Sequence, residues 1–186
     1  MNINNIELAK LETMIVSLTG FMGCGKSGTG KELAGLLSCG FTDLDRYIEH
    51  KTGQGIPEIF KDGEERFRAL EAEAVRDVII MNMVSGGDLV VALGGGTLSI
   101  ASVREFILQN TVCVYLKASL DSCLEWVGDR ASRPMLNNPG ISPEALFKSR
   151  EPFYERAAIT VEVNGKTFRQ TAEAIRDLLP VQKLFL

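Results

Sequence analysis

The stretch Gly20-Phe21-Met22-Gly23-Cys24-Gly25-Lys26-Ser27 follows the pattern G-x-x-x-x-G-K-[ST] at every position. An apolar run precedes it at residues 14–19 and a helical pattern follows at residues 26–38, which is the strand and helix context that the pattern requires. Its glycines let backbone N–H groups turn around an anion, and the helix N-terminus adds its dipole. We therefore predict a phosphate-binding loop in which Lys26 reaches the β- and γ-phosphates and Ser27 ligates Mg²⁺.

A second glycine pattern overlaps this loop, because residues 23–28 also read G-x-G-x-x-G. Asp43 and Asp45 follow roughly 20 residues later, where a dinucleotide-binding fold places the acid that holds a ribose. A nicotinamide-dependent enzyme is therefore an alternative. Three features favour the triphosphate instead: the Lys-Ser pair suits a triphosphate with its metal, the preceding strand ends at Gly20, and 186 residues leave little room for a separate substrate domain.

The rest of the chain predicts strands that alternate with helices. The predicted strands are residues 14–19, 41–43, 89–93, 112–116 and 160–163. The predicted helices are residues 26–38, 47–52, 64–84, 99–109, 120–127, 143–157 and 167–179. The clearest strands are apolar runs with little polar alternation, which is typical of strands covered on both faces. We therefore predict an α/β fold with a parallel sheet and helices on each side.

The length of 186 residues suggests a single domain. Residues 1–13 lack the apolar segment of a signal peptide, so we expect an N-terminal extension followed by one domain at residues 14–186. Residues 128–140 are polar and rich in glycine and proline, which predicts a long loop. Loops of this length often act as lids.

Composition excludes several classes of function. The formal net charge is −4 and the pI is about 5.2, so we expect neither nucleic acid nor a membrane as partner. His50 is the single histidine, which excludes a multi-histidine metal site and disfavours a Ser-His-Asp hydrolase. The four cysteines include no C-x-x-C pair, so free thiols in a reducing cytoplasm are expected. No apolar run reaches the ~18 residues of a membrane span.

Two acids, Asp43 and Asp45, lie at the end of the predicted strand 41–43. Ligands gather at the carboxyl ends of parallel strands, and a spacing of two places both side chains on one side if the chain stays extended. One acid could then hold a water of Mg²⁺ while the other orients or deprotonates an attacking hydroxyl. The alternative is that both residues cap the next helix.

Gly94-Gly95-Gly96 ends the strand at residues 89–93, and four arginines are candidates for anion binding: Arg68, Arg130, Arg133 and Arg150. Three successive glycines let the backbone approach a ligand closely, although such a triplet is also a common way to enter a helix. A guanidinium suits bidentate binding of a carboxylate or a transferring phosphoryl group. The alternative for each arginine is a solvated place on the surface.

Taken together, these motifs resemble the shikimate kinase family from about residue 14 to residue 179. Six features carry the resemblance, in this order: the loop at 20–27, Asp43-x-Asp45, Gly63-Glu64-x-x-Phe67-Arg68, the triplet at 94–96, Arg133-Pro134, and Arg150-x-Pro152-x-Tyr154. The resemblance implies a three-layer αβα P-loop kinase fold with a five-stranded parallel sheet and a mobile lid at about residues 128–140. It also implies transfer of the γ-phosphate of ATP to the 3-hydroxyl of shikimate, with Mg²⁺, in aromatic amino-acid biosynthesis.

The resemblance assigns roles to individual residues. The catalytic residues would be Lys26, Arg133 and Asp45, which would hold the reacting hydroxyl and act as its base. The ATP-binding residues would be Gly23, Cys24, Gly25, Lys26, Ser27, Gly28, Arg130 and Arg133. The residues that bind shikimate would be Asp45, Arg68, Gly94, Gly95, Gly96 and Arg150, with the two arginines on the carboxylate. Ser27 would bind Mg²⁺ directly, and Asp43 would act on it through a water.

The chain departs from the family at two positions. Gly28 stands where the family has threonine, and glycine costs the first turn of a helix up to about 1 kcal/mol. Trp126 lies near the place of an arginine that stacks on adenine, so either Trp126 or Arg130 would take that role. Two other functions stay open: a kinase for another carboxylated polyol such as gluconate, or a non-catalytic nucleotide-binding protein. We expect a cytoplasmic monomer.

Overall fold

The strands form one sheet in the computed structural model, which describes residues 13–127, 140 and 142–180. They span Ile15–Thr19 (β1), Gly40–Asp43 (β2), Leu89–Ala92 (β3), Val112–Lys117 (β4) and Ile159–Glu162 (β5). Their order across the sheet is β2-β3-β1-β4-β5, and every neighbouring pair is parallel. The predicted parallel α/β fold with five strands is confirmed.

Strand β1 lies at the centre of the sheet, and all of its residues are buried. Its Ser17 lies opposite Val91 of β3 on one side and opposite Cys113 of β4 on the other. Strand β3 is also buried throughout, whereas the edge strands β2 and β5 keep exposed residues. The inner strands are therefore covered on both faces, as their unbroken apolar runs predicted.

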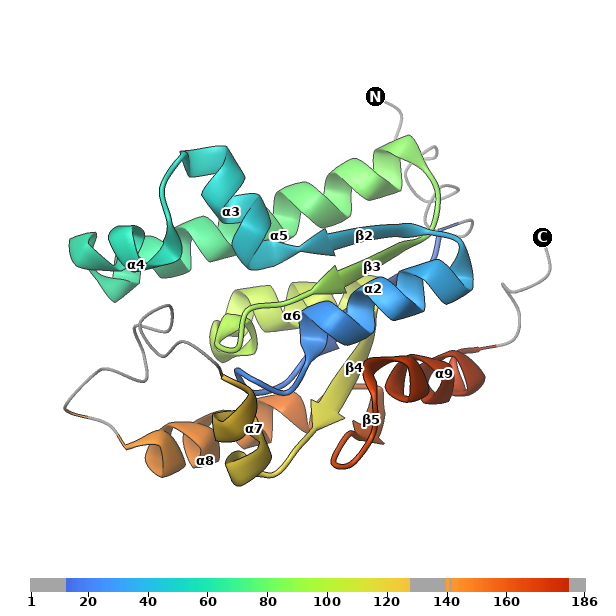
Figure 1. The fold of residues 1–186 in the computed structure, drawn as a ribbon. Helices are drawn as coiled ribbons and strands as arrows, with labels where there is room; N and C mark the ends of the chain where they lie inside the picture. The colour runs from blue at the N-terminus through green and yellow to red at the C-terminus, as the bar shows by residue number, and fades with distance from the viewer. Residues whose placement is uncertain (1–12, 128–139, 141, 181–186) are drawn as a thin grey trace.

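Helices cover both faces of the sheet. They span Lys26–Leu37 (α2), Leu44–Thr52 (α3), Ile56–Ile59 (α4), Glu64–Ser85 (α5), Ala101–Asn110 (α6), Leu120–Trp126 (α7), Pro143–Tyr154 (α8) and Phe168–Leu178 (α9). Figure 1 shows α2 and α9 side by side on the near face, with α5 and α6 behind the sheet. Within the described ranges, no helix is long and apolar enough to cross a membrane.

Some helix boundaries differ from the prediction. Helix α3 begins at Leu44 rather than at 47, because the side chain of Asp43 accepts a hydrogen bond from the N–H of Arg46 (3.3 Å) and so caps the helix. Helix α4 was not predicted, although Pro57 in its first turn is well placed to start a helix. Helix α8 ends at Tyr154 rather than at 157.

The topology brings the segments that follow three strands together at the carboxyl end of the sheet. The phosphate-binding loop follows β1, Asp43 ends β2, and Gly94 follows β3 closely. Because β2, β3 and β1 are parallel neighbours, the segments after them meet at the carboxyl ends of the strands. The predicted motifs, which are far apart in sequence, therefore lie around one part of the sheet.

Candidate active site

The loop after β1 turns sharply at two glycines. Gly23 has φ of 84° and Gly25 has φ of 89°, the left-handed region that favours glycine. A Cβ atom on Gly23 would lie 2.1 Å from the carbonyl oxygen of Cys123, so a side chain has no room there. Cys24 lies between the two glycines and is buried. The loop leads directly into α2, whose first residue is Lys26.

The Lys26 side chain folds back over the loop. Its Nζ donates hydrogen bonds to the carbonyl oxygens of Gly20 (2.9 Å) and Phe21 (3.0 Å), and the residue is buried. Its Nζ also lies 3.8 Å from Sγ of Cys24. The ammonium group is thus held at the loop, where the sequence predicts that it meets phosphates.

Ser27 and Asp43 meet between α2 and β2. The Ser27 hydroxyl donates to Oδ2 of Asp43, and Oδ1 of Asp43 accepts from the backbone of Arg46. Asp43 therefore caps α3, as one interpretation of the sequence predicted, and it also faces Ser27. Asp45 is different, because it lies in the first turn of α3 rather than on an extended strand.

The donors at this point fit a magnesium ion that arrives with a nucleotide. Among the described residues, no group of three or more His, Cys, Asp or Glu side chains could hold a metal by itself. Mg²⁺ is usually bound by one or two carboxylates together with substrate phosphates and waters. The hydroxyl of Ser27 and the carboxylate of Asp43, next to a phosphate-binding loop, are donors of this kind.

These side chains face one cavity of about 540 Å³, within the size range of small-molecule sites. Its lining residues come from five segments of the chain and are Met22, Gly23, Gly25, Lys26, Ser27, Gly28, Asp43, Asp45, Leu93, Gly95, Trp126 and Phe168. A Cβ atom on Gly94 would lie 3.4 Å from Oδ1 of Asp45, so the glycine triplet and Asp45 are neighbours. The cavity therefore joins the phosphate-binding loop, both acids and the triplet in one site.

Two arginines lie against the glycine triplet. A Cβ atom on Gly96 would lie 2.5 Å from Nη1 of Arg68, and one on Gly95 would lie 3.6 Å from Nη1 of Arg150. Arg150 is only 5% exposed, and the Arg68 side chain is 18% exposed. The alternative of solvated surface arginines is therefore wrong for these two residues. The absence of side chains on the glycines lets both guanidinium groups approach the turn.

The two arginines differ in their partners. Nη1 of Arg68 contacts Oε2 of the fully buried Glu71 at 2.7 Å, and Nη2 contacts Oε1 of Glu64 at 2.9 Å. Burial opposes the charge of Arg68, but these two carboxylates outweigh it and raise its pKa. Within the described part of the chain, Arg150 has no carboxylate at ion-pair distance. Burial lowers the pKa of Arg150, and the charge of Arg68 also lowers it.

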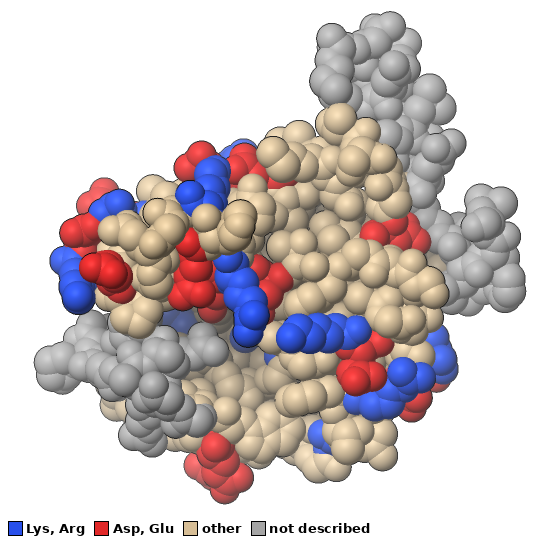
Figure 2. Space-filling model, turned by 45° about the horizontal axis from the view of Figure 1, so that its top comes forward, with Lys and Arg blue, Asp and Glu red and all other residues tan. Residues whose placement is uncertain are grey.

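A buried cation without a counter-ion is costly unless an anion joins it. The exposed charges, by contrast, have charges of opposite sign nearby. On the face that Figure 2 shows, basic and acidic side chains alternate and form no single large basic area. The buried Arg150, next to the half-buried Arg68, thus marks a local site for a small anion.

An aromatic pair borders the phosphate-binding loop. Trp126 at the end of α7 and Phe168 at the start of α9 are 46% and 44% exposed, with ring centroids 6.0 Å apart and nearly perpendicular planes. A Cβ atom on Gly28 would lie 2.5 Å from the Phe168 ring. Gly28 thus leaves room for Phe168, and α2 starts regularly at Lys26 despite the glycine.

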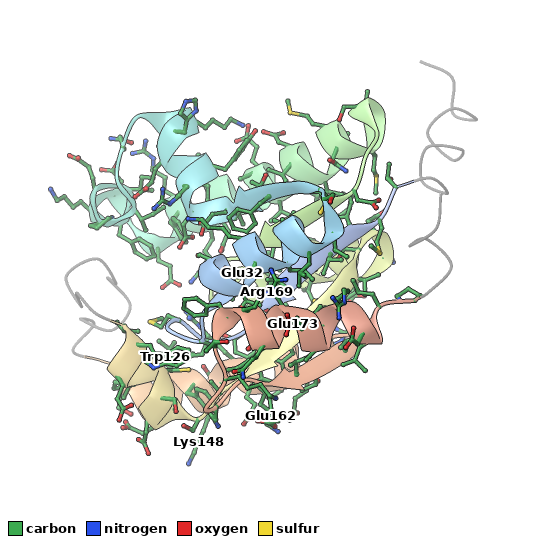
Figure 3. The ribbon with its side chains drawn as sticks, turned by 45° about the vertical axis from the view of Figure 1, so that its right-hand side comes forward. Glu32, Trp126, Lys148, Glu162, Arg169 and Glu173 are labelled. Atoms are coloured by element: carbon green, nitrogen blue, oxygen red, sulfur yellow. The ribbon has the colours of Figure 1, made fainter. Side chains whose placement is uncertain are left out.

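An ion pair at the surface joins α9 to α2. Arg169 of α9 contacts Glu32 of α2 at 3.5 Å and Glu173 of its own helix at 3.0 Å. Figure 3 shows these three side chains together, with Trp126 further along the same face. Exposed pairs of this kind contribute little to stability, so the packing of Phe168 rests mainly on its fit against α2.

The sequence did not single out Glu71, Thr97 or Phe168. Glu71 holds Arg68, and its Oε1 accepts a hydrogen bond of 2.5 Å from the hydroxyl of Thr97 behind the triplet. A spacing of three residues on a helix was the available signal for the Arg68–Glu71 pair. Arg130, Arg133 and the predicted lid at 128–140, apart from Gly140, lie outside the described residues.

Comparison with known proteins identifies the family of this chain. The profile of the family described as "Shikimate kinase" matches residues 22–180. Shikimate kinase from Thermus thermophilus is 41% identical over 181 residues, which cover 92% of this chain and 95% of the relative. The solved structure of shikimate kinase from Acinetobacter baumannii in complex with shikimate matches with a TM-score of 0.80 and 35% identity, over 91% of this chain and 96% of that one.

A more distant neighbour shares the fold alone. A gluconokinase from Sinorhizobium meliloti has a TM-score of 0.52 but only 16% identity, over 87% of this chain and 88% of that one. The family match and the relatives at high coverage confirm the family resemblance that the six motifs carried. The chain belongs to the shikimate kinase family.

Proposed function

We propose that the protein transfers the γ-phosphate of ATP to the 3-hydroxyl of shikimate, giving shikimate 3-phosphate and ADP. The observation that carries this proposal is the placement of the buried Arg150, which has no carboxylate partner among the described residues, beside Arg68 and the glycine triplet that borders the cavity of the phosphate-binding loop. A planar carboxylate matches two guanidinium groups, and shikimate carries one carboxylate. Membership of the shikimate kinase family and the A. baumannii relative solved in complex with shikimate support this acceptor.

At the nucleotide end, Lys26 would leave the two loop carbonyls and bind the β- and γ-phosphates. Backbone N–H groups of Gly23, Cys24 and Gly25 would surround the phosphates. Ser27 would hold Mg²⁺ directly, and Asp43 would hold it through a water. The metal would neutralise charge on the phosphates when bound. Arg133 would add a further positive charge at the γ-phosphate, from the predicted lid.

At the acceptor end, Arg68 and Arg150 would bind the carboxylate while the triplet Gly94–Gly96 lines the ring. Asp45 would then accept a hydrogen bond from the 3-hydroxyl and take its proton as the bond to phosphorus forms. Its place next to Gly94 and in the same cavity as Ser27 supports this role. Phosphoryl transfer needs positioning and charge neutralisation more than covalent catalysis, so these residues suffice.

For the nucleobase, we propose Trp126 together with Phe168, because both are half exposed and line the cavity beside Gly25 and Gly28. Stacking on aromatic rings suits a purine. Arg130 would contribute from outside the described residues. We also propose that the protein acts as a cytoplasmic monomer. Its acidic net charge favours neither nucleic acid nor a membrane as partner.

The test is a coupled assay of ADP release with Mg-ATP and three acceptors: shikimate, gluconate and nucleoside monophosphates. We expect ADP release that depends on shikimate, with gluconate and the monophosphates at background. Release with gluconate alone would favour the second candidate acceptor. ATP binding without release for any acceptor would favour a non-catalytic nucleotide-binding protein.

A further inference from the structure

The hydroxyl of Tyr154 contacts the glycine triplet, although Tyr154 has no part in the proposed binding of ATP or shikimate. Tyr154 is the last residue of α8 and is 1% exposed. Its Oη donates a hydrogen bond to the carbonyl oxygen of Gly95. Its ring also packs against the ring of Tyr115 on β4, with centroids 5.3 Å apart. A buried tyrosine thus reaches from α8 to the middle of the glycine triplet.

This contact fixes the direction of a peptide group. In a trans peptide the carbonyl and the next N–H point in opposite directions. Because the Gly95 carbonyl points toward Tyr154, the N–H of Gly96 points away from it. The Gly94 carbonyl is held in the same way, by the N–H (3.2 Å) and the hydroxyl (3.0 Å) of Thr97, so the N–H of Gly95 points away from Thr97.

Two successive N–H groups are therefore directed away from the buried donors behind the turn. Neither the N–H of Gly95 nor that of Gly96 donates to another residue in the described part of the chain. The turn that carries them lies next to both guanidinium groups, with Gly96 beside Arg68 and Gly95 beside Arg150. Backbone donors next to two cations form a suitable cradle for one anionic or hydroxyl group of a ligand.

The same helix also carries one of the arginines. Arg150 precedes Tyr154 by one turn of α8, so both side chains lie on the same side of the helix. Burial raises the pKa of Tyr154, and the charge of Arg150 opposes this only in part. The hydroxyl therefore keeps its proton and stays a donor at any working pH.

We propose that Tyr154 is a positioning residue for the acceptor: through its hydrogen bond to the Gly95 carbonyl it aims the N–H of Gly96 into the acceptor site and sets the glycine turn against Arg150. This inference rests on the proposed function, because it concerns the acceptor half of the same site. Tyr154 itself does not touch the reacting atoms. Gly95 itself also lies beside the phosphate-binding loop, since a Cβ atom on it would be 3.3 Å from the backbone N of Met22. The N–H that Tyr154 aims belongs to Gly96, which lies against Arg68, so we expect the effect on the acceptor.

The test compares Tyr154→Phe with Tyr115→Phe. Both changes remove one hydroxyl from the same buried ring pair, but no hydrogen bond from Tyr115 to the triplet exists among the described residues. We expect Tyr154→Phe to raise the KM for shikimate about five- to tenfold, as expected for one neutral hydrogen bond. The KM for ATP stays within twofold, and Tyr115→Phe leaves both KM values unchanged.

A double-mutant cycle with Arg150→Ala separates positioning from a general loss of structure. If Tyr154 acts through the cradle that Arg150 completes, the two changes together raise the KM for shikimate by less than the product of their single effects. Independent effects on KM, or equal rises in the KM for ATP and for shikimate, would overturn the inference. A wild-type protein that turns over no shikimate would instead overturn the proposed function, whatever Tyr154→Phe does.

Discussion

At the scale of single residues, the three cations of the site differ in the groups that neutralise or hold them. Lys26 is held by carbonyl oxygens and Arg68 by two carboxylates, whereas Arg150 has no carboxylate at ion-pair distance among the described residues. The residue left without a counter-ion is the one that gains most from an anionic ligand. Arg150 is therefore the sharpest marker of the acceptor in the described part of the chain.

Replacing Arg150 tests that marker. We expect Arg150→Ala to raise the KM for shikimate by roughly ten- to a hundredfold, the size of one hydrogen bond to a charged group, with a smaller change in kcat. Steady-state kinetics with each substrate varied in turn would measure it. Arg156→Ala is a matched control just beyond the same helix, because the Arg156 side chain is 44% exposed and forms an ion pair with Glu105 at the surface. A loss of ATP affinity instead would show that Arg150 serves the nucleotide.

Replacing Asp45 tests the proposed base. We expect Asp45→Asn to lower kcat by at least about a hundredfold, the usual size of general-base catalysis, while ATP binding measured by titration calorimetry stays the same. Asn keeps the size of the side chain and removes its capacity to take a proton. Turnover close to that of the wild type would mean that another group accepts the proton.

At the scale of elements, the packing of α9 against α2 explains a residue that departs from the family pattern. Gly28 was predicted to weaken the first turn of its helix, whereas the structure shows that it accommodates Phe168. The sequence could not reveal this contact, because 140 positions separate Gly28 from Phe168 and only the fold brings them together. Asp43 was easier to predict, since it ends a predicted strand just before the predicted helix 47–52, and Ser27 lies at the start of the predicted helix 26–38.

The effect of replacing Gly28 on the free energy of unfolding is therefore expected to change sign when Phe168 is removed. Gly28→Ala in the wild type should lower the free energy of unfolding, because the added Cβ displaces the Phe168 ring. In a Phe168→Ala background the same change should raise it, since helix propensity then favours alanine by up to about 1 kcal/mol. Urea denaturation of the four proteins would measure both effects. The same effect in both backgrounds would contradict the contact.

The aromatic pair at the ends of α7 and α9 gives a direct optical test. The chain has one tryptophan, Trp126, so its emission reports this site without labelling. We expect ADP to change the fluorescence of Trp126, and Phe168→Ala to weaken ADP binding severalfold through loss of stacking. Shikimate alone should leave the emission nearly unchanged. An ADP complex, detected by calorimetry, without any change in emission would place the base elsewhere.

At the scale of the whole molecule, the fold brings basic side chains together in one site, although the chain as a whole is acidic. The net charge of −4 agrees with the mixed signs on the face of Figure 2, yet the buried Lys26 and Arg150 and the half-buried Arg68 lie around one site. Motifs and apolar runs were enough to predict the five strands and the described α-helices other than α4, and they singled out most of the residues that line the cavity. They did not predict Glu71, Thr97 or the Tyr154 hydroxyl, because these act through contacts that form only in the folded chain.

The central claim is that this chain phosphorylates the 3-hydroxyl of shikimate. Its most direct test is phosphorus and proton NMR of a reaction of the purified protein with Mg-ATP and shikimate. We expect one new phosphate ester, coupled to the proton on carbon 3, that accumulates in step with ADP. An unchanged shikimate spectrum in the presence of an enzyme that binds ATP, or an ester on a different hydroxyl, would contradict the claim.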